Sequence, residues 1–453
     1  MKTGNMIVAI VLVALCLIGW LSFGHNVISQ ASDYEQYVAQ GDSWVEEGLY
    51  QRAIGQYEMA LEQKSTEELL SKMHNAYQLR YAEAPEETLE AYMDFLQSAV
   101  NAFPANKNFV DSYVQIYCAE EAYEDAYTCL SKAIEKGYNT DEVKAMQRKV
   151  RYVYDVGRTS YYMLTQSEGN TYATHRKDGH NAYGIELGYI LTRTYDYVGL
   201  PSADGIVVVT GNDSRLIDKT GLVMGIFDEK VTEAGVYADG LVPACCNGVY
   251  SYYDEFADKK FGEYEMAGKF QNGVAAVKEK GAWKLINTSG EVVCESLGEI
   301  VLDYAGCHMN SGVIIARTAS NEFTIYNDEY EPVATISCTD VDICTEDGII
   351  AVCQNRVWGF ANTKGEIIIE AQYEKAKSFS NGVAAVCKDG LWGFIDKENN
   401  LVIEYQFYDV GYMGSTGACA VCVAVPETGE EAEGLELYET WKFITLKLGI
   451  LEG

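Results

Sequence analysis

Histidine is scarce in this sequence, with five residues among 453. They are His25, His74, His175, His180 and His308, and only His175 and His180 stand close together, on either side of a predicted hairpin tip. The chain also has no Gly-Lys-Ser/Thr phosphate loop and no Gly-x-Ser-x-Gly nucleophile elbow. A histidine-centred metal site, a phosphate-loop nucleotide site and a serine-hydrolase elbow are therefore not indicated. We predict that the chain is not an enzyme, and we expect no catalytic, cofactor-binding or metal-binding residues.

Basic residues are also few, since 34 Lys and Arg stand against 67 Asp and Glu, giving a formal net charge of −33. A chain this acidic repels nucleic acid phosphates and anionic membrane surfaces, so we expect neither as a partner. We expect most of the acidic residues to keep the surface solvated. The alternative is that they attract basic partners or cations. The polar turns at 396–400 and 327–331 could touch calcium, but neither has the ligand spacing of a known calcium loop.

Thirteen cysteines would suggest disulfides in a protein outside the cytoplasm. Their placement indicates free, mostly buried thiols instead, because Cys245, Cys353, Cys387 and Cys422 recur at one position of a repeated unit. The other copies carry non-cysteine residues at that position, namely Thr174, Thr210, Lys278 and Arg317. The best candidates for a bridge are Cys118 and Cys129, on predicted neighbouring helices. Cys419 and Cys422 have CxxC spacing, but on a predicted strand they face opposite ways, which is weak support for zinc or redox chemistry.

An uncharged apolar run at residues 6–23 is just long enough to span a bilayer. The first charges after it are Asp33 and Glu35, and no Lys or Arg appears until Arg52. This pattern predicts a single-pass cell-membrane anchor at residues 1–30, with a cytoplasmic amino terminus and the bulk of the chain extracytoplasmic. A cleaved signal peptide, processed after Gly24 or Ala31, is the alternative.

Residues 31–157 show an apolar period of 3.6 and few Gly or Pro, which predicts helices. The spacing resembles tetratricopeptide repeats, most clearly in Tyr37, Gly41, Trp44, Gly48, Tyr50, Ala53, Tyr57 and Ala60. A degenerate copy ends near Ala99 and Pro104, and a weaker one follows from Val110 to Ala133. The resemblance implies an all-α solenoid whose concave face docks peptides or proteins. A rigid spacer is the alternative, and the acidity of the segment disfavours a basic clamp for carboxyl termini.

From residue 158 to 453 the chain repeats one phrase of about 35 residues. The copies begin at Gly169, Gly205, Gly240, Gly273, Gly312, Gly348, Gly382 and Gly417. In the clearest copy an alternating segment at 382–387 is followed by Asp389-Gly390, the signature of a two-residue hairpin turn. Strands at 391–396 and 401–403 follow, so each unit is predicted to hold three short strands.

The pairs Trp358-Gly359 and Trp392-Gly393, each followed by Phe and then Asn362 or Asp396, resemble the WG-repeat family of bacterial proteins. The copy at Gly273 keeps Trp283 but has Lys284 in place of the glycine. The weaker copies have other residues in the Trp position, namely Tyr183, Leu216, Tyr250, Phe323 and Trp441. The resemblance implies a β-repeat domain and little about activity. We expect the Trp to wedge between adjacent units and the Gly to leave room for the next unit's backbone. A stacking platform for sugar rings is the sharper alternative.

The fold predicted is therefore multidomain: a transmembrane helix (1–30), a tetratricopeptide-like solenoid (31–157) and a WG-like β-repeat domain (158–453). Eight units suit a propeller-like ring of three-stranded blades, with an open β-solenoid as the alternative. A segment at 158–164 has strand character and could complete the last unit, which removes an unpaired edge.

The function predicted is an extracytoplasmic scaffold that engages protein partners through its helical and β repeats. A cell-envelope glycan-binding module and an envelope enzyme with an unrecognised site are the alternatives. The binding residues are unknown.

Overall fold

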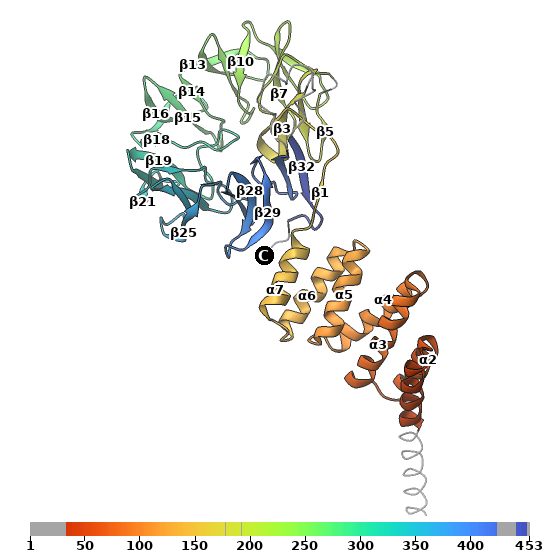
Figure 1. Cartoon of the computed structure of the whole chain (residues 1–453). Helices are drawn as coiled ribbons and strands as arrows, with labels where there is room; N and C mark the ends of the chain where they lie inside the picture. Colours follow the sequence, from red (N-terminus) through yellow and green to blue (C-terminus); the bar gives the residue numbers. More distant parts are fainter. Residues whose placement is uncertain (1–32, 177, 192, 424–440, 451–453) are drawn as a thin grey trace, which may run out of the picture. The chain divides into compact units, whose positions relative to one another are not determined.

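The computed structural model describes residues 33–176, 178–191, 193–423 and 441–450. The chain divides into two compact units, Met1–Arg151 and Tyr152–Gly453. The first unit is helical and the second is built from β-sheets (Figure 1).

The helical unit is a succession of antiparallel helices in which each helix contacts the next along the chain. Residues 33–46 form a helix that ends before Gly48, and the helices that follow are α2 (Tyr50–Leu61), α3 (Glu67–Glu83), α4 (Pro85–Ala102), α5 (Lys107–Ala119), α6 (Tyr123–Glu135) and α7 (Asp141–Arg151). Side-chain caps start two of them, because Thr66 accepts a hydrogen bond from the Leu69 amide and Asn106 from the Phe109 amide.

The two helices of the first hairpin approach each other closely, as the small residues in its sequence predict. A Cβ at Gly41 would lie 2.4 Å from the Tyr57 ring of α2, so only glycine fits there. The Tyr57 hydroxyl donates a 2.8 Å hydrogen bond to Asp42, which also pairs with Lys72 of α3 at 2.7 Å. These contacts fix the order of the first three helices.

The predicted membrane anchor, and the single-pass extracytoplasmic location built on it, do not hold. Among the residues described, no helix has both the length and the apolar character needed to cross a membrane. The run at 6–23 itself lies outside the described residues.

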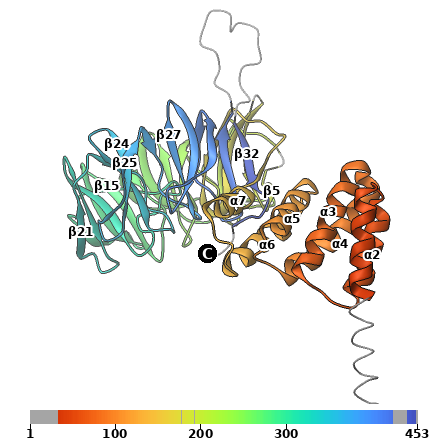
Figure 2. The same ribbon diagram turned by 60° about the horizontal axis from the view of Figure 1, so that its bottom comes forward.

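The second unit consists of eight four-stranded antiparallel sheets arranged around a common axis, a β-propeller (Figures 1 and 2). Blades 1 to 4 are β2 (Met163–Gln166), β3 (Thr171–Arg176), β4 (Gly179–Gly184), β5 (Gly188–Tyr189); β6 (Tyr197–Val198), β7 (Val207–Thr210), β8 (Ser214–Ile217), β9 (Val223–Ile226); β10 (Val231–Ala234), β11 (Val242–Cys246), β12 (Val249–Tyr253), β13 (Lys259–Tyr264); and β14 (Met266–Ala267), β15 (Val274–Glu279), β16 (Ala282–Asn287), β17 (Val292–Glu295). Blades 5 to 8 are β18 (Glu299–Ile300), β19 (Ile314–Ala319), β20 (Glu322–Tyr326), β21 (Pro332–Ile336); β22 (Asp340–Val341), β23 (Ile349–Gln354), β24 (Val357–Asn362), β25 (Ile367–Tyr373); β26 (Lys375–Ala376), β27 (Val383–Lys388), β28 (Leu391–Asp396), β29 (Leu401–Phe407); and β30 (Asp409–Val410), β31 (Ala418–Cys422), β32 (Trp441–Leu446), β1 (Tyr154–Val156).

The ring is closed, as predicted, by a strand that precedes the first repeat. That strand is β1, which pairs with β32 in the register Tyr154↔Leu446 to Val156↔Ile444 and completes blade 8. The segment predicted for this role, 158–164, leads instead into β2, the first strand of blade 1. Blades 1 and 8 then meet directly, because Tyr172 packs against Phe443.

The prediction of three-stranded blades is wrong, since every blade has four strands. The missing strand is the innermost one, and in blades 4 to 8 it is two residues long. A two-residue strand is too short to show any alternation of polar and apolar residues, so the sequence pattern carries no sign of it. The remaining three strands lie where they were predicted, with the turn Asp389-Gly390 (φ +52° and +77°) joining β27 to β28.

The glycine at the head of each unit helps to join neighbouring blades. Gly382 has a φ of +86° and donates its amide to the Asp347 carboxylate of the preceding blade at 2.7 Å. Gly273 and Asp239 make the same 2.7 Å contact between blades 3 and 4. The apolar core lies in layers between the sheets, so each blade is stabilised by its neighbours.

Candidate functional site

The histidines do not meet in one place. His175 and His180 face each other across β3 and β4 with ring centroids 4.2 Å apart, while His74 and His308 are buried in different units. Burial lowers the pKa of both His74 and His308 to about 4, so each is neutral at pH 7. His25 lies outside the described residues, and within them no group of three or more His, Cys, Asp or Glu side chains is placed to hold a metal ion.

The cysteines in the described part of the chain, Cys118 and Cys129 included, are free thiols. Cys419 and Cys422 both lie on β31, and Cys419 is fully buried. Burial raises the pKa of the Cys419 thiol to about 12, which makes it a packing residue rather than a nucleophile.

The polar turns after the third strand of each blade are structural caps. Asp396 accepts hydrogen bonds from the Glu398 and Asn400 amides at 3.1 and 2.8 Å, and from the Asn400 side chain on both carboxylate oxygens. Asn327 makes the same pair of backbone contacts in blade 5. The conspicuous Asn or Asp of the repeat therefore closes a turn.

The repeated cysteine position lies directly opposite the aromatic position on the next strand. This cross-strand pair recurs in six blades, as Cys245↔Tyr250, Lys278↔Trp283, Arg317↔Phe323, Cys353↔Trp358, Cys387↔Trp392 and Cys422↔Trp441. In blades 1 and 2 the partners are Asn181 and Ser214, so Tyr183 and Leu216 stand two residues away from the predicted position.

The prediction that the Trp rings wedge between blades is confirmed for Trp283 and Trp392, whereas Trp358 is half-buried against the core between blades 6 and 7. Trp283 is 8% exposed and packs with Ile314 and Ala316 of blade 5, and Trp392 packs with Val421 of blade 8. Rings buried in this way present no face on which a sugar could stack.

The glycine after the Trp has a different role from the one predicted. A Cβ at Gly393 would lie 2.6 Å from the Ile403 carbonyl oxygen, and one at Gly359 would lie 2.5 Å from that of Ile369. These carbonyls belong to the outer strand of the same blade, where the pairing shifts register just after the Trp. The glycine therefore makes room for a β-bulge in its own sheet, not for the next unit.

The centre of the ring is filled by polar side chains from blades that are not neighbours. Lys269 of blade 4 pairs with Glu168 of blade 1 at 2.5 Å. The Tyr412 hydroxyl of blade 8 donates to Asp342 of blade 6 at 2.8 Å, and the centre of its ring lies 5.3 Å from that of Tyr304 of blade 5. Burial raises the pKa of Asp342, although hydrogen bonds from the Ser378 amide and Tyr412 oppose the shift. These contacts link blades across the axis of the ring.

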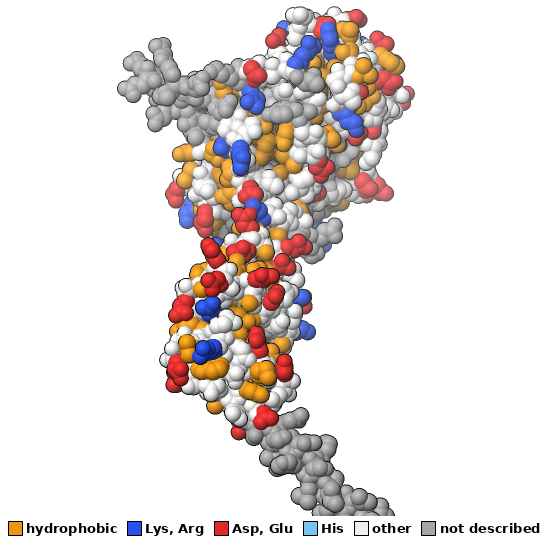
Figure 3. Space-filling model, turned by 90° about the vertical axis from the view of Figure 1, so that its right-hand side faces the viewer, with side chains coloured by type: hydrophobic (Ala, Val, Ile, Leu, Met, Phe, Trp, Pro, Cys, Tyr) orange, Lys and Arg blue, Asp and Glu red, His pale blue; other side chains and the backbone are white. Residues whose placement is uncertain are grey.

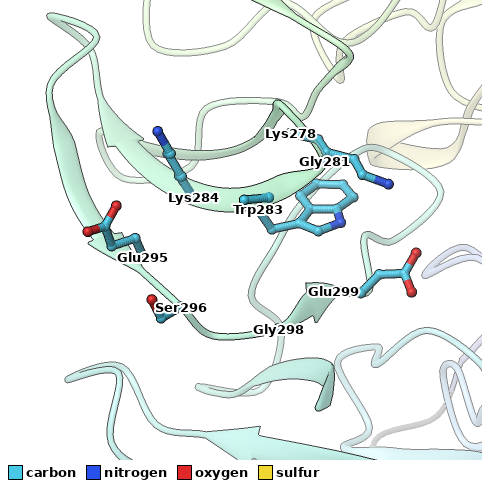
Figure 4. Close-up of a pocket in the computed structure, with 9 residues that line it drawn as sticks. Lys278, Gly281, Trp283, Lys284, Glu295, Ser296, Gly298 and Glu299 are labelled. Carbon is cyan, nitrogen blue, oxygen red and sulfur yellow. The ribbon is translucent and has the colours of Figure 1, made fainter. Parts of the chain in front are cut away.

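A hollow of about 480 Å³, which we call the Trp283 groove, lies at the junction of blades 4 and 5. Figure 4 shows Lys278, the indole nitrogen of Trp283 and Glu299 on one side of it, and Lys284 and Glu295 on the other. The lining residues are Lys278, Gly281, Ala282, Trp283, Lys284, Glu295, Ser296, Gly298 and Glu299. Trp283 and Lys278 belong to the repeat pattern, but nothing in that pattern indicates a groove beside them.

Two hydrogen-bond donors of the groove are not used inside the protein. The Trp283 indole N–H is buried and has no acceptor among the described residues. The Lys278 ammonium lies 6.0 Å from the centre of the Trp283 ring and pairs with no carboxylate in the described part of the chain. The groove thus offers a cation and an indole N–H, both suited to an acceptor group.

The family model described as "WG containing repeat" matches residues 261–283, 358–392 and 392–423. The matches at 358–392 and 392–423 begin at a Trp of a strand, and those at 261–283 and 358–392 end at one. Each match of the family model therefore runs from one blade into the next. No curated protein sequence matches the chain.

Several solved structures are similar to the chain at low identity. The Dos1 propeller is 11% identical, with a TM-score of 0.41 over 67% of this chain and 96% of that one. BamB from Moraxella catarrhalis is 9% identical, with a TM-score of 0.39 over 64% and 92%. The first TPR of Spaghetti (RPAP3) bound to HSP90 peptide SRMEEVD is 16% identical, with a TM-score of 0.21 over 26% and 90%. No property of these proteins is transferred on likenesses of this size. The family match stands on the repeat itself: the chain carries WG repeats at residues 261–283, 358–392 and 392–423.

Proposed function

We propose that this chain is a protein-interaction scaffold without a catalytic site of its own, and that its propeller binds a partner protein at the Trp283 groove. The propeller fold is commonly such a scaffold. The observation that carries the proposal is the pair of unused donors in the groove, Lys278 and the Trp283 indole N–H.

The way the other polar groups are used supports this proposal over an enzyme. The carboxylates at the ring centre are engaged, Glu168 by Lys269 and Asp342 by Tyr412 and the Ser378 amide. A general acid or base must instead be within reach of a substrate. The buried indoles likewise disfavour a glycan platform, which needs exposed aromatic faces.

We further propose that the helical unit is tetratricopeptide-like, on the strength of the close helical hairpin at Gly41 and Tyr57. Two of its lysines already have partners, since Lys72 pairs with Asp42 and Lys107 with Asp111. This use of the lysines favours a role as spacer or adaptor over capture of a carboxyl terminus.

Site-specific photocrosslinking tests the proposed function. A benzophenone amino acid replaces Ala282, which is exposed and lines the groove, in the full chain produced in its native cells. The matched control carries it at Val357, the first residue of the corresponding strand in blade 6. We expect a discrete crosslinked protein from position 282 and not from position 357. Identical crosslinks from both positions, or none above background, would contradict the proposal.

A further inference from the structure

The stretch from the last strand of blade 3 to the third strand of blade 4 carries a charge opposite to that of the chain as a whole. Residues 259–284 contain six lysines, three glutamates and no aspartate, whereas the net charge of the whole chain is −33. Figure 3 shows acidic side chains spread over the face of the molecule that it presents, with basic ones in smaller groups. A local excess of lysine in this setting indicates a site for an anionic group.

Most of these lysines are already used. Lys269 pairs with Glu168 in the ring centre, and Lys260 lies 3.4 Å from Asp254. Lys284 and Lys280 share Glu279, at 2.8 and 3.6 Å. Of the two lysines that line the groove, Lys278 is different, because its ammonium lies over the Trp283 ring and pairs with no carboxylate in the described part of the chain.

The acidic residues that line the groove each lie near a cation. Glu299 lies 3.8 Å from Arg317 of the same blade, which also pairs with Asp340 at 3.2 Å. Glu295 acts on Lys284, whose raised pKa owes most to its hydrogen bond with Glu279 and less to Glu295. Lys278 is therefore the charged residue of the lining that has no ion-pair partner in the described part of the chain, and it lies next to the unused indole N–H of Trp283.

We infer that the Trp283 groove binds a carboxylate group of the partner protein, which accepts hydrogen bonds from the Lys278 ammonium and the Trp283 indole N–H. This inference rests on the proposed function and names the chemistry that the partner must offer. Hydrogen bonds to a charged group are stronger than neutral ones, and the flexible lysine stem lets Lys278 move aside from the indole edge as the carboxylate enters.

The repeat supplies an internal comparison. Blades 6 and 7 have Cys353 and Cys387 where blade 4 has Lys278, and Gly359 and Gly393 where blade 4 has Lys284. A thiol is a weak, uncharged donor and cannot neutralise a carboxylate. We therefore expect one carboxylate site per chain, in blade 4.

The test measures the binding of two fluorescent peptides to the full chain by anisotropy. One peptide contains a run of glutamates and has an amidated carboxyl terminus, and the other is neutral with a free carboxyl terminus. The variants are Lys278→Cys, which copies blades 6 and 7, and Trp283→Phe, which copies Phe323 of blade 5 and removes the N–H. The control is Lys388→Met, which removes an exposed lysine from the same end of blade 7.

We expect the wild-type chain to bind one of the peptides saturably at one site. Binding should weaken at least about tenfold in Lys278→Cys and in Trp283→Phe, and by less than about twofold in Lys388→Met. The peptide that shows this pattern identifies the source of the carboxylate, an acidic side chain or a chain terminus.

Two results would overturn the inference: no saturable binding of either peptide to the wild-type chain, or equal affinity in the two blade 4 variants and the wild type. The proposed function is judged separately, because a crosslink from position 282 that survives Lys278→Cys would keep the groove as an interaction site and reject the carboxylate.

Discussion

Replacing Gly393 by alanine should destabilise the propeller through one steric contact. The added Cβ would lie 2.6 Å from the Ile403 carbonyl oxygen and 3.0 Å from the Tyr405 nitrogen, both backbone atoms of β29. Neither atom can move without shifting the bulge that places Phe407 opposite Trp392. Overpacking of this kind costs about 2 kcal/mol, and we expect the free energy of unfolding to fall by that amount.

Urea unfolding followed by tryptophan fluorescence measures the effect, since Trp392 adjoins the substitution. The matched control is Gly211→Ala, because a Cβ built at Gly211 meets nothing within 4 Å and its φ is not positive. The control should stay within about 0.5 kcal/mol of the wild type. Blade 4 shows that the cost depends on the bulge. It has Lys284 at the position of Gly393, and there Lys284 lies opposite Glu295 on the next strand with no shift of register beside it. Equal stability of Gly393→Ala and the wild type would refute the role given to this glycine.

Three further predictions concern closure, pH and the thiols. Asp155→Pro removes a backbone N–H from the closing strand β1 and should destabilise the propeller by about 3 kcal/mol in urea unfolding, whereas Asp155→Ala should change little. The pKa of buried His308 is about 4 against an ordinary 6.5, so its contribution to stability is complete above pH 6.5 and is lost as the pH falls toward 4. Over that range the free energy of unfolding of the wild type should fall by up to about 3 kcal/mol more than that of His308→Gln. Parallel pH profiles of the two proteins would contradict this prediction. The ten buried thiols should resist alkylation in the native chain at pH 8, and all twelve described thiols should react in urea without reductant; unreactive pairs in urea would reveal disulfides.

Much of the propeller could be predicted from sequence because its repeat contains strong local signals. In blade 7, the alternation in 382–387 and the Asp389-Gly390 turn define two strands, and both lie where they were expected. The innermost strands, such as Lys375–Ala376, escaped prediction because two residues show no period. The closing strand was placed a few residues late for a related reason: Tyr154–Val156 is three residues long and is fixed by its pairing with β32, a contact that no local pattern encodes.

The groove was beyond prediction for a different reason. Trp283 and Lys278 were each assigned to repeat positions, which correctly predicted that the indole would pack between blades. Whether a buried N–H finds an acceptor depends on the neighbouring blade, since Glu299 belongs to β18 of blade 5 and Gly298 to the linker that leads to it. The wrong role for Gly393 has the same origin, because the bulge is a property of the paired strand and not of the Trp-Gly motif.

Hydrogen–deuterium exchange of the full chain tests the closed ring most directly. The amide of Gly157 donates to the Phe443 carbonyl at 2.7 Å, and that of Lys447 donates to the Val153 carbonyl at 2.8 Å. The pairing of β1 with β32 is therefore hydrogen-bonded at both of its ends. We predict that peptides covering 153–157 exchange as slowly as those covering β27 in the interior of blade 7. Exchange of 153–157 at the rate of an unstructured segment, while β27 stays protected, would show that the ring is open and would contradict the account.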